Sequence, residues 1–230
     1  MRWIDRRYRR GWKRSVSSND TLTKEVVVKP KVVPQVTAPV FDKQEDFVGS
    51  YIKTRVPLFY SYVVAQCDIA NRAHFGGQTL LSPTLVLAII LAESSGNPWA
   101  CRYEPSFFSW LVKRIKDQTI RYSKGITRQT EETSRATSFG LMQVMGQTAR
   151  EIGFKGDFLT QLCDPEINVT YGVKYLVSRM KLYHKKEEYI AAYNSGKPKY
   201  SKVTGRLINE SYVVKVHEYQ RKIRLGLSEV

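Results

Sequence analysis

An almost wholly apolar segment that ends in a single acid is the feature that most constrains the fold of this chain. Residues 85–92 read Leu-Val-Leu-Ala-Ile-Ile-Leu-Ala, and Glu93 follows directly. Ser82-Pro83 before the segment is typical of a helix start, and a glycine and a proline soon after it are typical of a helix end. We therefore expect one buried helix over residues 83–95.

Glu93 has an unusual position for an acidic residue. At helical spacing it shares a face with Val86, Ile89 and Ile90, so its carboxyl is expected among hydrocarbon side chains. Burial disfavours the charged form, and a protonated carboxyl near neutral pH can act as a general acid. A solvent-exposed acid is the common alternative. Against it, the C-terminal end of a helix favours a cation over an anion.

Three further segments contain residue types that suit carbohydrate binding. They are Ser-Phe-Gly-Leu-Met-Gln-Val-Met at 138–145, Ala-Ala-Tyr-Asn-Ser-Gly at 191–196 and Asn-Glu-Ser-Tyr-Val-Val-Lys-Val at 209–216. In the first segment, the Gln143 amide can donate and accept hydrogen bonds, as an acetamido group requires. Met142 and Met145 offer adaptable apolar surface for sugar rings, and Gly140 allows close backbone approach. A short core segment is the alternative reading.

The second and third segments each contain a tyrosine in a helical context. Tyr193 combines a ring with a polar tip, which suits contact with a sugar, and Asn194 is expected to bond to the scaffold. Gly196 is placed to end that helix. Asn209 is the candidate N-cap of a last helix whose Tyr212 lies either in the core or near Glu93.

Taken in this order, Glu93-Ser94 and the three segments resemble the four motifs of the soluble lytic transglycosylase family. Residues 164–176 also look like the helix that precedes the family's Ala-Tyr-Asn motif, and the resemblance covers roughly residues 80–225. It implies a mainly α, lysozyme-like fold of the goose-type or lytic transglycosylase kind. It also implies an enzyme that cuts the glycan strands of peptidoglycan.

The resemblance implies a reaction with one acidic residue in place of the usual two. Glu93 would protonate the oxygen between N-acetylmuramic acid and N-acetylglucosamine, then remove the proton from the C6 hydroxyl, which leaves a 1,6-anhydromuramoyl end. Carried over by motif, the substrate-binding residues are Ser94, Gln143, Met145, Tyr193, Asn194 and Tyr212. No cofactor or metal is implied, and the three histidines show no ligand spacing.

The chain departs from the family in the connection between the first two motifs. Forty-six residues separate Glu93 from Gly140, and the additional material runs from about 101 to 137. This insertion contains an Arg-Tyr-Glu-Pro stretch that looks like bacteriophage virion-associated transglycosylases. A second carboxylate from it would make a hydrolytic muramidase, and the candidates are Glu104, Asp117, Glu131 and Glu132. Because aromatic and basic residues outnumber acids there, we favour an extension of the substrate groove.

The N-terminal part differs in composition from the rest of the chain. Residues 1–43 begin with seven Lys or Arg among the first 14 and continue into a Val/Pro-rich stretch, so we expect a disordered basic arm. Residues 44–230 are expected to form the catalytic domain. Ahead of Glu93, apolar residues that include Phe59, Val63 and Ile69 predict one or two amphipathic helices.

Charge and targeting bear on partners and location. The formal net charge of +16 suits peptidoglycan carboxylates, and the basic arm with its aromatic residues also suits nucleic acid or another anionic surface. No stretch resembles a secretory signal or a membrane span. We therefore expect a virion-associated enzyme that acts in the periplasm or cell wall when a phage genome enters, with contacts to other virion proteins. A lysis enzyme held in the host cytoplasm before release, and a non-catalytic virion or DNA-associated protein, are the alternatives.

The three cysteines do not form an even set. Cys67, Cys101 and Cys163 leave at least one thiol unpaired. We expect buried apolar thiols in place of a disulfide framework.

Overall fold

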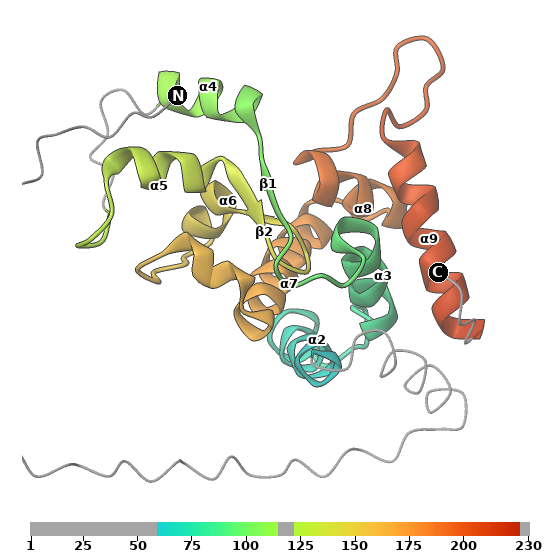
Figure 1. Cartoon of the computed structure of the whole chain (residues 1–230). Helices are drawn as coiled ribbons and strands as arrows, with labels where there is room; N and C mark the ends of the chain where they lie inside the picture. Colours follow the sequence, from blue (N-terminus) through green and yellow to red (C-terminus); the bar gives the residue numbers. More distant parts are fainter. Residues whose placement is uncertain (1–58, 115–121, 226–230) are drawn as a thin grey trace, which may run out of the picture. The chain divides into compact units, whose positions relative to one another are not determined.

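The apolar segment forms helix α3, Pro83–Ser94, in the computed structural model of the chain (Figure 1). The Ser82 hydroxyl accepts a hydrogen bond from the backbone N–H of Leu85, and Pro83 occupies the first turn, where its missing N–H costs nothing. All of residues 85–91 are buried. Ser95 adopts a left-handed conformation and ends the helix one residue earlier than predicted.

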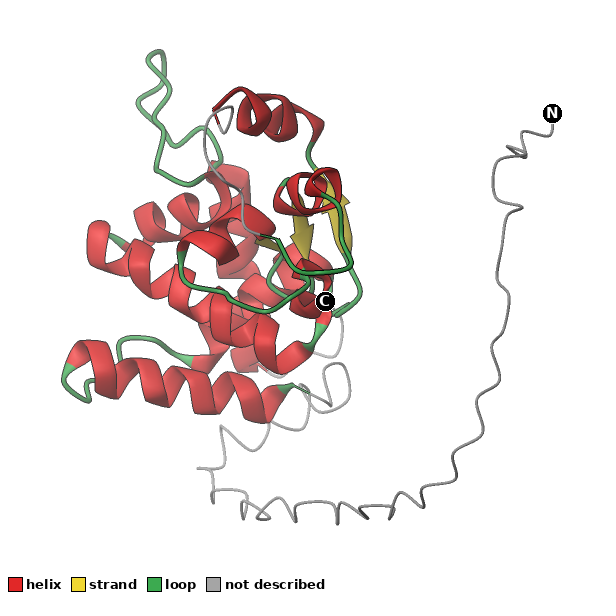
Figure 2. Ribbon diagram, turned by 90° about the vertical axis from the view of Figure 1, so that its left-hand side faces the viewer, coloured by secondary structure: helices red, strands yellow, loops and turns green. Residues whose placement is uncertain are grey.

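The structure describes residues 59–114 and 122–225. The predicted arm over 1–43, the domain boundary at 44 and Asp117 lie outside the described residues. The described part is mainly helical, which confirms the predicted fold class, and the short strands make up a small part of it (Figure 2).

Helix α3 and four other helices build the core. The others are α2 (Tyr60–Phe75), α7 (Pro165–Leu182), α8 (Lys186–Ser195) and α9 (Glu210–Leu225). Helix α3 packs along α9, α2 packs on α7, and α8 contacts both α7 and α9 (Figure 1). The apolar residues of these helices meet in one cluster. One prediction for α2 is wrong: Ile69 is 51% exposed, because the buried face of α2 includes Val63, Cys67 and Ala70.

A small antiparallel sheet lies beside the helices, in the order β1-β2-β3. Its strands are β1 (Cys101–Tyr103), β2 (Thr137–Phe139) and β3 (Val144–Met145). Cys101 pairs with Phe139, and Phe139 pairs in turn with Val144. The remaining elements are α4 (Pro105–Arg114), α5 (Arg128–Arg135), α6 (Gly146–Glu151) and the 3-10 helix η2 (Leu159–Cys163).

The predicted insertion over 101–137 is therefore built into the domain. It supplies β1, which pairs with β2, and the helices α4 and α5, which contact each other. Without β1, strand β2 would have no neighbour on one side, because β1 is the edge strand that pairs with it.

Asn168 of α7 anchors the segment 139–145 by hydrogen bonds to its backbone. The Asn168 side-chain nitrogen, Nδ2, donates its two hydrogens to the carbonyl oxygens of Phe139 and Leu162 at 2.8 and 2.7 Å. Its Oδ1 accepts from the Met142 N–H at 2.7 Å. Gly140 has a φ of +71°, and a Cβ there would collide with the Asn168 side chain. The glycine thus permits packing against α7, which corrects the prediction that it makes room for a saccharide.

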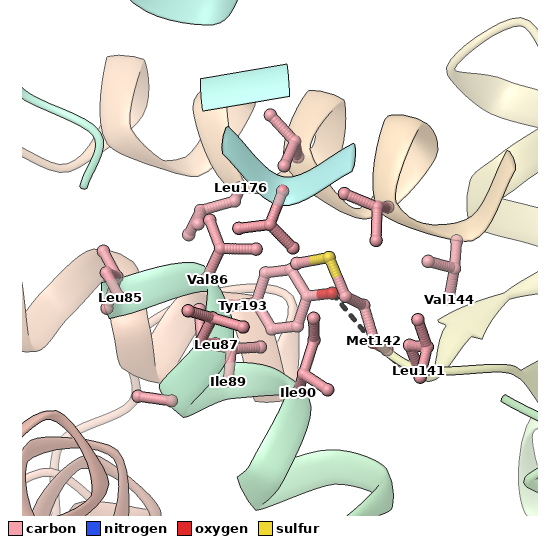
Figure 3. Close-up of a cluster of buried hydrophobic side chains, with 14 of the residues drawn as sticks. Leu85, Val86, Leu87, Ile89, Ile90, Leu141, Met142, Val144, Leu176 and Tyr193 are labelled. Atoms are coloured by element: carbon pink, nitrogen blue, oxygen red, sulfur yellow. Dashed lines mark hydrogen bonds between the residues drawn. The ribbon is translucent and has the colours of Figure 1, made fainter. Parts of the chain in front are cut away.

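Met142 points into the core and not toward a sugar, which corrects a second prediction. Its side chain is completely buried among residues such as Val86, Ile90 and Leu176 (Figure 3). It also lies against Gly172 of α7, where a Cβ would collide with the Met142 side chain. Met142 therefore contributes to folding stability.

Candidate active site

A cleft of about 600 Å³ opens beside the C-terminal end of α3. This volume lies within the range of small-molecule and saccharide sites. Helices α3, α4, α6, α7 and α8 and the three strands all contribute to its walls. Its lining residues are Glu93, Arg102, Glu104, Ser106, Phe107, Trp110, Ser138, Gln143, Val144, Met145, Thr148, Tyr175, Tyr193, Asn194, Ser195 and Gly196.

Glu93 lies in the last turn of α3 and faces this cleft. Burial raises the pKa of its carboxyl above the ordinary value, because the charged form loses hydration. A hydrogen bond from Tyr212 and the positive charges of Arg102 and Lys215 oppose part of this rise. The group is thus suited to carry a proton at a higher pH than an exposed glutamate does.

Tyr212 and Lys215 of α9 both donate hydrogen bonds to the end of α3. The Tyr212 hydroxyl donates to Glu93 Oε1 at 2.6 Å, and Lys215 Nζ donates to the Ala92 carbonyl at 3.0 Å. The lysine places a cation at the negative end of the α3 dipole. Tyr212 is not among the residues that line the cleft, so the geometry favours positioning of Glu93 over contact with substrate.

Ser94 also acts on the scaffold side. Its single hydroxyl hydrogen is shared between the carbonyl oxygen of Leu141, 2.7 Å from Oγ, and that of Ile90, 3.1 Å from Oγ. Ser94 does not line the cleft, although the motif carries it over as a substrate-binding residue. The bond to Leu141 joins α3 to the segment that carries Gln143.

Gln143 lines the cleft with its side-chain amide fixed in one orientation. Nε2 donates to the carbonyl oxygens of Ala100 and Gly140, both at 2.9 Å. Because both amide hydrogens are used, this side chain can only accept a hydrogen bond from a ligand. The backbone of Gln143 has a φ of +47°, an uncommon value for a residue with a side chain. Met145 lies at the end of β3 on the same wall.

Tyr193 and Asn194 close the cleft from α8. Tyr193 is 7% exposed, and its hydroxyl donates to the Met142 carbonyl at 2.8 Å (Figure 3). Burial and the negative charge of Glu93 raise the pKa of Tyr193 well above its ordinary value, so the phenol stays protonated. Its polar tip therefore serves the scaffold, contrary to the expected contact with sugar substituents. Asn194 is exposed, and its Oδ1 accepts a hydrogen bond from Asn209 at 3.1 Å.

The structure therefore brings five of the seven predicted residues to one cleft, namely Glu93, Gln143, Met145, Tyr193 and Asn194. Ser94 and Tyr212 lie behind it. Other lining residues were not singled out from the sequence, and they include Arg102, Phe107, Trp110 and Tyr175. The abundance of aromatic residues in the insertion was a signal for the α4 residues. Tyr175 has no signal apart from its place in the segment 164–176, which resembles a family helix.

The described candidates for a second carboxylate differ in whether they line the cleft. Glu104 lines the cleft, where Arg102 Nε binds it at 2.6 Å. Glu131 is completely buried in an ion-pair cluster with Arg135 and Arg150, each at 2.9 Å. Glu132 pairs with Arg128 at 2.7 Å along α5. Of these three, only Glu104 shares the cleft with Glu93.

The described residues also bear on metal binding and on membrane insertion. Within 59–114 and 122–225, no three His, Cys, Asp or Glu side chains gather where a metal ion could be held. Among the helices of the same part of the chain, none is both long and apolar enough to span a membrane.

A half-buried acid with a raised pKa beside a polar and aromatic cleft, in a mainly helical domain, is typical of lysozyme-like enzymes that cleave glycosidic bonds. Residues 76–208, more than half of the chain, match the family described as the transglycosylase SLT domain, and the chain belongs to this family. The protein is accordingly a lytic transglycosylase, a lyase that cleaves glycosidic bonds of peptidoglycan. Comparison with curated proteins and with solved structures gave no significant match.

Proposed function

We propose that Glu93 is the acid and then the base of a reaction that leaves 1,6-anhydromuramoyl ends on the glycan strand. In the first step Glu93 gives its proton to the oxygen between N-acetylmuramic acid and N-acetylglucosamine, and the C1–O bond breaks. In the second step the Glu93 carboxylate takes the proton of the C6 hydroxyl, whose oxygen bonds to C1. No water is consumed, and Glu93 ends protonated as it began.

The observation that carries this proposal is the environment of Glu93. The carboxyl faces the cleft, its pKa is raised by burial, and Tyr212 holds Oε1 at 2.6 Å. A general acid needs a raised pKa, whereas the carboxylate formed after proton transfer needs a stabilising donor. Burial provides the first condition, and the Tyr212 hydroxyl together with Arg102 provides the second.

Substrate positioning would come from the walls of the cleft. Gln143 offers only its carbonyl oxygen, which suits the N–H of an acetamido group. Met145 and the edge of the Tyr193 ring offer apolar surface near Glu93. Asn194 offers an amide at the open end. We assign these four residues to substrate binding and Ser94 and Tyr212 to positioning.

The α4 helix would extend the saccharide groove. Phe107 and Trp110 lie on its cleft side with ring centroids 5.2 Å apart, and Trp110 is 49% exposed. Exposed aromatic faces suit the apolar faces of sugar rings. The insertion therefore supports groove extension, as favoured from its composition.

A hydrolytic muramidase is a second candidate because Glu104 shares the cleft. A hydrolase would need Glu104 as a base or nucleophile. The pairing with Arg102 at 2.6 Å argues for a structural role, since the guanidinium already occupies this carboxylate.

One digestion separates these functions. Purified peptidoglycan is incubated with the protein, and the masses of the soluble fragments are measured by mass spectrometry. Anhydro ends are expected, and Glu93→Gln abolishes their release while Glu104→Gln retains it. If the products instead have reducing ends that carry an added water, and if Glu104→Gln no longer forms them, the protein is a muramidase. Retained cleavage by Glu93→Gln would overturn the assignment of Glu93.

We also propose that a phage carries this enzyme in its particle and opens the wall locally as its genome enters the cell. The support is the Arg-Tyr-Glu-Pro stretch at 102–105, which resembles phage enzymes and here forms part of the cleft, and the basic composition of residues 1–14. Detection of the protein and of wall cleavage in purified particles is the expected result. A non-catalytic DNA-associated protein would instead bind DNA with strong salt dependence and leave the wall intact.

A further inference from the structure

Two cysteines that lie far apart in sequence meet at the back of the cleft wall. Cys101 begins strand β1 and Cys163 ends η2, and their Sγ atoms are 3.7 Å apart. Cys163 is 8% exposed, whereas Cys101 is open to solvent. The expectation of three buried thiols is therefore wrong for Cys101.

A small movement of the two cysteine side chains would bring their sulfur atoms to disulfide distance. The bond requires sulfurs about 2.0 Å apart and side chains that point toward each other. The thiols already face one another, and Cys101 lies on a three-residue edge strand that can adjust. We propose that Cys101 and Cys163 are a redox pair whose disulfide fastens β1 to the η2–α7 junction when the protein reaches an oxidising compartment.

The reaction is ordinary thiol–disulfide exchange with a small disulfide as oxidant. The exposed Cys101 thiolate attacks one sulfur of the oxidant, forms a mixed disulfide and releases one small thiol. The Cys163 thiolate then attacks the Cys101 sulfur and releases the second small thiol. The two protein thiols lose two electrons and two protons, and the oxidant is reduced to two thiols.

Exposure sets the order of these steps. Burial, together with the neighbouring Cys101 thiol, raises the pKa of Cys163 to about 12, so Cys163 is the poorer nucleophile toward an external oxidant. Once Cys101 carries the small thiol, Cys163 is the nearest attacking group. The short distance between the Cys163 and Cys101 sulfurs compensates for the low thiolate fraction of Cys163.

The strand that would be fastened carries part of the active site. Arg102, the next residue after Cys101, lines the cleft, and its positive charge opposes part of the rise in the pKa of Glu93. The preceding carbonyl of Ala100 accepts hydrogen bonds from Gln143 Nε2 at 2.9 Å and from the Gly140 N–H at 2.8 Å. A covalent link at Cys101 would therefore hold this wall in register with Glu93.

The location of the substrate supplies the condition for oxidation. The family acts on peptidoglycan, which lies outside the cytoplasmic membrane, and the bacterial periplasm maintains disulfides whereas the cytosol keeps thiols reduced. The bond would thus form on arrival at the wall. The inference of a disulfide rests on the proposed function in one respect only, namely the compartment in which the two thiols are oxidised.

Cys67 provides a matched internal control. It is 2% exposed on α2, in the main core, and burial raises its pKa to about 12. Cys67→Ala removes a thiol without touching β1, η2 or the cleft.

The test treats the full chain with oxidised glutathione and, in parallel, with dithiothreitol. The oxidised protein is expected to lose two hydrogens by intact mass and to keep one alkylatable thiol in denaturant, where the reduced protein has three. Its Tm is expected to rise by about 5–10 °C, since the bond closes a long loop of the unfolded chain. Cys101→Ser and Cys163→Ala remove both effects, and Cys67→Ala retains them.

Other outcomes overturn the proposal. They are a stable glutathione adduct on Cys101 that Cys163 does not displace, a covalent dimer through Cys101, or an oxidised protein no more stable than the reduced one. Glu93→Gln is expected to form the same disulfide, so failure of the redox pair and failure of the proposed catalysis are read separately.

Discussion

The Tyr212 hydroxyl donates a 2.6 Å hydrogen bond to Oε1 of Glu93, across 119 residues of sequence. This bond joins α9 to the last turn of α3, where the two helices pack together. It favours the charged form of Glu93, whereas burial of the same carboxyl favours the neutral form. The two effects act on opposite halves of the proposed reaction.

Tyr212→Phe is therefore expected to move the pH dependence of wall cleavage. Loss of a donor to the carboxylate, a bond of about 1.5–3 kcal/mol, raises the pKa of Glu93 further. The acid then stays protonated to higher pH, so the alkaline limb of activity shifts upward while the maximum rate falls, because the carboxylate is less stabilised. Turbidity loss of purified wall across a pH series measures this. Tyr219→Phe on the same helix is the control, and an unmoved limb in Tyr212→Phe would contradict the role.

Glu93→Gln is expected to gain stability relative to the native chain as the pH rises. The folded-state pKa of Glu93 is raised above the unfolded value, so its favourable contribution is complete below the unfolded pKa and is lost as the pH passes upward through the folded one. The amide does not titrate. The difference in free energy of unfolding should grow by about 1.4 kcal/mol for each unit of pKa elevation and then level off. Urea unfolding at a series of pH values measures it, and a constant difference would count against the buried acid.

Trp110→Ala is expected to weaken substrate binding more than catalysis. Loss of one aromatic face from the groove should raise KM by about tenfold with kcat nearly unchanged. Kinetics on soluble glycan oligomers separate the two constants. Trp99→Ala is the matched control, since Trp99 is 74% exposed and does not line the cleft. Equal effects of the two substitutions would refute a groove formed by α4.

Asn168→Ala is expected to lower the free energy of unfolding by about 2–4 kcal/mol, because it leaves buried backbone groups of Phe139, Met142 and Leu162 without their partner. Denaturant titration measures the loss. Asn97→Ala removes one exposed bond to Trp99 and is expected to cost under about 1 kcal/mol. An equally small loss of unfolding free energy in Asn168→Ala would show that water replaces the hydrogen bonds of Asn168.

Local signals predicted the helix boundaries well. Ser82-Pro83 begins α3 and Gly196 ends α8, as their chemistry requires. The spacing of Glu93 behind an apolar run also indicated a carboxyl held in a low-polarity setting, and its raised pKa agrees with that.

Predictions about the use of individual side chains were less successful. Gly140 and Met142 were expected at the substrate and instead pack against α7. Cys101 was expected to be buried and instead lies exposed beside Cys163. Residue type describes what a side chain can bond to, but not which of several partners it meets.

The amino-acid sequence alone indicated where α3 begins, where α3 and α8 end, and that an acid stands at the end of the apolar helix, because caps, prolines and apolar spacing act within a turn or two of chain. Only the tertiary structure decided which neighbours of that acid face the cleft. The partners of Ser94, Tyr193 and Tyr212 lie 47, 51 and 119 residues away, and a hydrogen bond to such a partner depends on how the helices pack.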